Sequence, residues 1–236
     1  MDSSPDSEQY GLSHRAHRQL IGYLGLLLPV ILLALDRMRP TIELTPWRPL
    51  GSISAYYYTG AVAALVGVLF ALALFLLTYG GSHPHPADRA AGLLAGSAAL
   101  GVAFFPTGAP TGMAGPSWWS PSTRTIHYVS AAVLFVMFIV FALWLFPKSR
   151  IPEGAALPSG KKWRNRVYVS CGLAMVLSVV WTGTAVYTHR PILLPEAIAL
   201  WGFAISWLVK GYAHRTVINA VGRPFGFQMK PAAGDQ

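Results

Sequence analysis

Six long apolar stretches run through this chain, and they limit its fold more than any other feature. A helix needs roughly 20 mostly apolar residues to cross a membrane, because the hydrocarbon core is about 30 Å thick and each residue adds about 1.5 Å. The stretches are continuous and do not alternate, which favours helices over membrane strands. The expected spans are Gln19–Leu35, Ala55–Tyr79, Ala87–Phe105, Thr125–Phe146, Val167–Tyr187 and Pro191–Val209.

The composition agrees with a lipid environment. Of the 236 residues, 53% are hydrophobic and 11% are charged, whereas a soluble domain carries about 25% charged residues. The net charge of +9 does not indicate nucleic-acid binding, because the basic residues are not interleaved with aromatic residues in one module. We therefore predict an all-α, polytopic transmembrane bundle of six helices, with membrane lipids and no nucleic acid as partners.

The distribution of Lys and Arg predicts the orientation of this bundle. Most of the 18 basic residues lie in the N-terminal tail, the C-terminal tail and the loops after the second and fourth spans. Such segments face the cytoplasm in membrane proteins, so both termini are predicted to be cytoplasmic. We expect one transmembrane domain, 19–211, between cytoplasmic tails 1–18 and 212–236. The largest basic cluster, in the fourth loop, contains Lys148, Arg150, Lys161, Lys162, Arg164 and Arg166.

The polar residues of the spans gather at their extracytoplasmic ends. Asp36 ends the first span, Ser54 and Tyr56 open the second, and Glu196 lies early in the sixth. The middle of each span is almost free of polar groups, which argues against an ion pump or a large channel. We therefore predict a polar pocket near the extracytoplasmic face. Its candidate ligand-binding residues are Asp36, Ser54, Tyr56, His127, Ser130 and Glu196.

His127 and Glu196 are the candidate catalytic residues, as acid and base groups. Each also has a purely structural explanation: His127 as an interfacial side chain, and Glu196 as an acidic residue in the first turn of a helix after Pro195. A serine nucleophile with His127 as base and Glu196 or Asp36 as the orienting group would resemble a hydrolase triad. No nucleophile-elbow motif accompanies these residues. Metal ligands are too few for a zinc site, and we expect no cofactor.

The chain resembles a family of uncharacterised bacterial six-span membrane proteins. The resemblance lies in the run Ser52–Gly60, the Phe104–Thr107 end of the third span, the Ile126–Ala131 start of the fourth, and Glu196–Gly211 with its Ser206-Trp207 pair. More distantly, the architecture is similar to the DRAM/Frag/Sfk group. The resemblance implies a multi-pass protein of the bacterial cytoplasmic (inner) membrane, and it implies no activity.

The sequence favours a pocket that binds a lipid headgroup or a small amphiphile in a binding, sensing or accessory role. Two alternatives stay open at this point. One is a membrane-embedded enzyme that acts on lipids through His127 and Glu196. The other is a structural subunit, in which the polar residues hold the bundle together or contact a membrane protein partner or a second copy of the chain.

Overall fold

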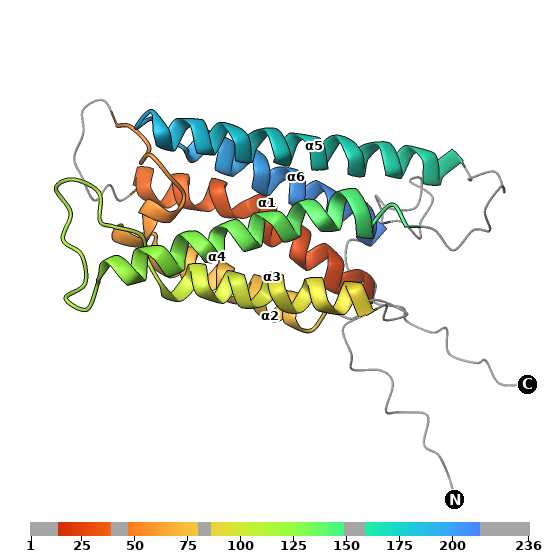
Figure 1. Cartoon of the computed structure of the whole chain (residues 1–236), viewed down its shortest axis with the longest axis horizontal. Coiled ribbons are helices and arrows are strands. Elements are labelled where there is room, and N and C mark those ends of the chain that lie inside the picture. The colour runs from red at the N-terminus through yellow and green to blue at the C-terminus, as the bar shows by residue number, and fades with distance from the viewer. Residues whose placement is uncertain (1–13, 39–46, 80–85, 149–158, 213–236) are drawn as a thin grey trace, which may run out of the picture.

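Six α-helices make up most of the residues that the structure describes (Figure 1). The computed structural model describes residues 14–38, 47–79, 86–148 and 159–212. Two short turns accompany the helices: the 3-10 helix η2 (Ser54–Tyr58) before α2, and the π-helical turn η3 (Phe141–Leu145) after α4. The helices are α1 (His14–Met38), α2 (Val62–Leu77), α3 (Pro86–Phe104), α4 (Pro121–Val140), α5 (Ser159–Tyr187) and α6 (Leu193–Tyr212).

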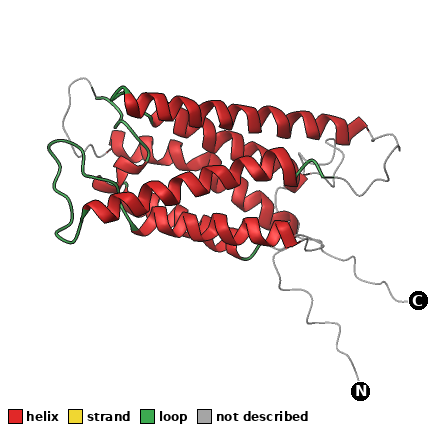
Figure 2. Ribbon diagram, in the orientation of Figure 1, coloured by secondary structure: helices red, strands yellow, loops and turns green. Residues whose placement is uncertain are grey.

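The helices form a closed ring in chain order. Each helix packs against the next one in the sequence, and α6 closes the ring by packing against α1. All six run along the long axis of the molecule (Figure 1), and no strand occurs in the described residues (Figure 2). The site end is the end of the bundle at which α1, α3 and α5 finish. The basic end is the opposite one.

Four of the helices are long and apolar enough to cross a membrane: α1, α4 with η3, α5 and α6. Many of their large apolar side chains are exposed, including Leu177, Val180 and Val129. Exposed apolar area of this extent suits a lipid surface and not water. The predicted all-helical membrane fold is thus confirmed at this level.

Several expected helix ends are wrong. The helix α1 begins at His14 and not at Gln19. The helix α5 begins at Ser159 and not at Val167. Its first turns therefore carry Lys161, Lys162, Arg164 and Arg166, which we had placed in a loop. Both helices extend past the apolar stretch because charged side chains are good helix formers once they reach water. Arg150 and the tails 1–13 and 213–236 lie outside the described residues.

The start expected for the second span is also wrong. Ser54–Tyr58 forms the separate turn η2, and α2 begins only at Val62. Thr59 is extended and breaks the helix. Its hydroxyl donates to the Tyr56 carbonyl at 2.9 Å and accepts from the Ala61 N–H at 3.1 Å, which replaces helical hydrogen bonds. This break turns Ser54 away from the α2 axis and into the bundle.

Small and aromatic residues fill the interior. Gly92 and Gly96 of α3 lie against α2. A Cβ added at Gly92 would come within 2.7 Å of the Leu76 carbonyl oxygen, and one added at Gly96 would come within 2.6 Å of Leu77 Cγ. These two glycines therefore allow α2 and α3 to pack closely. Toward the basic end, Phe138 stacks on Phe203 with a ring separation of 3.6 Å, and Trp207 is fully buried nearby. The aromatic core is therefore tightly packed at that end, where a hollow beside Lys162, Asn165 and Arg166 lies on the surface of α5; the two cavities inside the bundle lie toward the other end.

Candidate functional site

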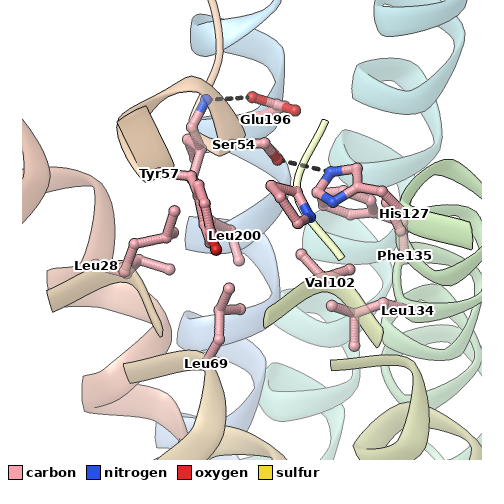
Figure 3. Close-up of a pocket in the computed structure, with 14 residues that line it drawn as sticks. Leu28, Ser54, Tyr57, Leu69, Val102, His127, Leu134, Phe135, Glu196 and Leu200 are labelled. Atoms are coloured by element: carbon pink, nitrogen blue, oxygen red, sulfur yellow. Dashed lines mark hydrogen bonds between the residues drawn. The ribbon is translucent and has the colours of Figure 1, made fainter. Parts of the chain in front are cut away.

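Ser54, His127 and Glu196 converge at the site end of the bundle. They come from three separate elements: η2, α4 and α6. All three side chains line each of two adjoining cavities. Figure 3 shows them around one space, with apolar residues such as Leu69, Val102 and Leu134 below them.

His127 is held by hydrogen bonds on both ring nitrogens. Its Nδ1 lies 2.7 Å from the Phe105 carbonyl oxygen, and its Nε2 lies 3.0 Å from Ser54 Oγ. A carbonyl only accepts, so Nδ1 carries the hydrogen and donates it. In the neutral ring Nε2 then accepts from the Ser54 hydroxyl. The ring is 3% exposed, and it points its acceptor nitrogen at a serine that faces the cavities.

The helix α4 places His127 one to two turns inside its first residue. Ser120 caps this helix: its side chain accepts from the Thr123 N–H, and the Thr123 hydroxyl accepts in return from the Ser120 N–H. Pro121 occupies the first turn, where its missing N–H costs nothing. These local signals move the start of α4 to Pro121 from the expected Thr125, and they fix the ring of His127 beside the end of α3.

Glu196 fixes the backbone next to Ser54. Its Oε2 accepts from the Ile53 N–H at 2.7 Å (Figure 3). The Gly51 carbonyl accepts from the N–H groups of Ile192 and Leu193, at 2.7 and 2.8 Å. The segment before η2 is therefore docked on the first turn of α6 by both backbone and side chain. Glu196 lies in that first turn, as its structural explanation required, and it also reaches the cavities.

The two cavities differ in size and surroundings. The inner one has a volume of about 50 Å³ and lies among side chains of η2, α1, α2, α3, α4 and α6. The outer one has a volume of about 340 Å³ and lies between α4, α5 and α6. Ser178, Thr182, Gly183 and Val186 of α5 form one helical stripe along it. The outer cavity is large enough for part of an acyl chain as well as for a polar group.

The outer cavity opens on the flank of the bundle. Tyr128 and Val136 of α4 and Val179 and Val186 of α5 line it and are exposed at the surface. Figure 1 shows α4 and α5 diverging toward the site end. The mouth of the outer cavity is therefore bordered by apolar side chains on the surface that suits lipid.

Three of the candidates from the sequence lie elsewhere. Tyr56 is fully buried, and its hydroxyl accepts from the Leu50 N–H at 3.3 Å. Asp36 is buried and accepts from the Trp47 indole N–H at 3.1 Å. Ser130 lies against Gly101 of α3. None of the three lines either cavity; their contacts instead hold Trp47 and Leu50 and support the packing of α3 on α4.

The Phe105 carbonyl is the part of the site that the sequence could not reveal, because every residue carries the same backbone carbonyl group. The segment that presents it is fixed from both sides. The Tyr58 hydroxyl and the Trp119 indole N–H both donate to the Thr107 carbonyl, the latter at 2.9 Å. The polar run Trp181–Thr184 gave a signal for the α5 lining, because Thr182 interrupts an apolar helix there.

The fold and this site define a helical membrane protein with a cavity that is polar at one end and apolar along its flank. Comparison with protein families, curated proteins and solved structures finds no match for this chain. Among the described residues, no group of three or more His, Cys, Asp and Glu side chains is placed to hold a metal ion.

Proposed function

We propose that this chain is a six-span protein of the bacterial cytoplasmic membrane, with both termini in the cytoplasm and the cavities near the extracytoplasmic face. The basic end carries Arg15 on α1, Lys161 on α5, Lys210 on α6 and Lys148 just after η3, which supports this orientation. The helix α2 has 16 residues, or about 24 Å. It spans the membrane as a pair with α3, whose residues Gly92 and Gly96 let the two helices pack closely.

The outer cavity binds an amphiphile, with its polar head at Ser54, His127 and Glu196 and its chain leaving between α4 and α5. Of the described residues, no Lys or Arg lines either cavity. A hydroxyl, an amine or an ester carbonyl would find hydrogen-bonding partners there, whereas a phosphate would meet a carboxylate and no cation. The ligand class is therefore a neutral or amine-bearing amphiphile, such as an acylglycerol.

One observation carries this proposal: three polar side chains from separate elements meet at the end of an apolar cavity whose mouth lies on the flank. The three groups are hydrogen-bonded within the protein, and a bundle that needed them only for its own cohesion would also leave no space beside them, because protein interiors pack closely. The pocket makes the protein a binding or accessory component for lipid in the outer leaflet.

A glycine on α5 allows this pocket to be closed without disturbing the fold. Gly183 lines the outer cavity, and a Cβ added there meets nothing within 4 Å. We expect Gly183→Trp to fill the mouth and to abolish binding of radiolabelled 1-O-hexadecylglycerol to the purified protein in lipid nanodiscs. Gly67→Trp is the matched control, because Gly67 is also an open helical position and lies away from both cavities.

The ether linkage of this probe keeps binding separate from any hydrolysis. Wild type and Gly67→Trp should bind it equally. Failure of the wild type to bind it, or unchanged binding in Gly183→Trp, would refute the pocket. Binding that is lost equally in both tryptophan variants would also count against it, because the loss would then follow from bulk on any lipid-facing helix.

A further inference from the structure

The geometry points to a reaction at this pocket: we propose that Ser54 and His127 form a catalytic dyad that hydrolyses an acyl ester of a hydroxyl-bearing amphiphile. This inference rests on the proposed function, because the pocket must bring the ester to Ser54. It goes further, because it assigns a nucleophile, a base and a bond that is broken.

Ser54 has the surroundings of an activated nucleophile. Its Oγ lies 3.0 Å from His127 Nε2, within the range that a base needs to remove the hydroxyl proton. Ser54 lines both cavities, so a ligand in either one would lie beside it. A serine that served only to pair with His127 would have no reason to lie at the meeting point of two cavities.

His127 has the tautomer that the reaction requires. Because Nδ1 donates to the Phe105 carbonyl at 2.7 Å, Nε2 is left as the acceptor that faces Ser54. In serine hydrolases a third group holds the imidazole in this orientation. A backbone carbonyl supplies that group here. It fixes the ring as a carboxylate does, and it stabilises the imidazolium less, so we expect slow turnover.

Glu196 is a positioning residue in this scheme. Its carboxylate accepts from the Ile53 N–H at 2.7 Å and so fixes the residue that precedes Ser54 in the chain. Ile53 is 7% exposed, and its peptide therefore has little water to replace this bond. The carboxylate acts on the reaction through the placement of Ser54 Oγ.

The reaction consumes one ester and one water. Ser54 Oγ attacks the acyl carbonyl carbon while its proton passes to His127 Nε2. The bond from that carbon to the alcohol oxygen then breaks, and His127 returns the proton to the departing alcohol. Water attacks the acyl-Ser54 ester and gives a proton to His127. The Ser54 oxygen leaves and takes that proton, which releases a fatty acid and restores the dyad.

The test compares two serine-to-alanine variants of one chain in nanodiscs supplied with 1-monooleoylglycerol, with released oleate measured by mass spectrometry. Ser54→Ala should lower the rate by at least about 100-fold, as loss of a nucleophile does in serine hydrolases. Ser130→Ala is the matched control, because Ser130 lies three residues from His127 on the same helix, packs on Gly101 and lines neither cavity. It should keep the wild-type rate.

Two further measurements separate chemistry from binding. Ser54→Ala should still bind 1-O-hexadecylglycerol, which shows that the variant is folded and its pocket is intact. A fluorophosphonate should add its mass to the peptide that contains Ser54 in the wild type, and the label should fall at least about 100-fold in His127→Gln, which lacks the base.

The possible outcomes distinguish a failure of the dyad from a failure of the pocket. If the wild type binds the ether but neither releases oleate nor takes the label, the dyad is refuted and the pocket stands. If Ser54→Ala keeps the wild-type rate, or if Ser130→Ala loses as much activity, Ser54 is not the nucleophile. If the wild type fails to bind the ether, the proposed function itself fails and the dyad fails with it.

Discussion

His127 is the residue through which the parts of the site are connected. Its ring joins the end of α3, through the Phe105 carbonyl, to η2, through Ser54. A buried imidazole with only one partner would be free to rotate or to exchange its tautomer. With both nitrogens engaged, the ring has one orientation, and the serine hydroxyl on its cavity side has one preferred direction.

Glu196 allows the role of its charge to be separated from the role of its hydrogen bond. Glu196→Ala removes the acceptor of the buried Ile53 N–H and should lower the free energy of unfolding by about 1–3 kcal/mol. Glu196→Gln keeps an oxygen that accepts from the same N–H, and it should stay within about 0.5 kcal/mol of the wild type. Unfolding by SDS titration in mixed micelles measures both.

The contrary result is equally informative. If the glutamine variant lost as much stability as the alanine variant, the negative charge of Glu196, and not its contact with Ile53, would hold the segment before η2 in place.

The residue types of the site could be chosen from the sequence, but their directions could not. Ser54, His127 and Glu196 stood out because polar groups are costly in an apolar span. Tyr56, Asp36 and Ser130 stood out for the same reason and yet lie away from the cavities. Which face of a helix meets which neighbour depends on packing between elements far apart in the chain, and one sequence carries little information on that.

Among the elements, the pair α2 and α3 depends most closely on single positions. Gly96→Ala would bring a Cβ within 2.6 Å of Leu77 Cγ and 2.9 Å of the Ala73 carbonyl oxygen. We expect the helices to be forced apart, with a loss of about 1–3 kcal/mol in the free energy of unfolding. The same SDS titration measures this loss.

Gly67→Ala serves as the control on the same pair. Its Cβ would meet nothing within 4 Å, and alanine is the better helix former by about 1 kcal/mol. This variant should therefore be unchanged or slightly more stable. Equal destabilisation of the two variants would contradict the assigned contact between α2 and α3.

Helix existence could be read from the sequence better than helix ends. All six expected apolar stretches are helical over most of their length. The ends differ because hydropathy marks where a helix leaves lipid and not where it stops. Thus α5 runs through four basic residues before its apolar part, and the Thr59 hydroxyl ends a helix-like run at η2 near the start of the second expected span.

The ring of six alternating helices gives the whole molecule two unlike ends. The basic end carries Lys148, Lys161, Lys162 and Lys210 beside a tightly packed aromatic core. The cavities lie toward the site end, where the loop between α3 and α4 carries Trp118 and Trp119. The proposed orientation places these two ends on opposite faces of the membrane, and that makes it testable by labelling.

Single cysteines report the orientation in intact bacterial cells. The native cysteine, Cys171, is half-buried in α5 and is first replaced by serine. Ser117→Cys, in the exposed loop before α4, should react with a membrane-impermeant maleimide added outside the cells. Lys148→Cys, exposed at the basic end, should react only after the membrane is permeabilised. The reverse pattern would overturn the orientation, and labelling of both from outside would overturn the six-span arrangement.

The flank position of the outer cavity has a kinetic consequence. A molecule that enters between α4 and α5 arrives by diffusion in the plane of the leaflet, so the quantity that governs occupancy is its mole fraction among lipids and not its concentration in water. Adding inert phospholipid at constant total ligand would then weaken saturation, whereas diluting the vesicles with buffer would leave it unchanged. Occupancy of the cavity would follow the lipid composition of the surrounding leaflet and would not respond to solutes in the water phase.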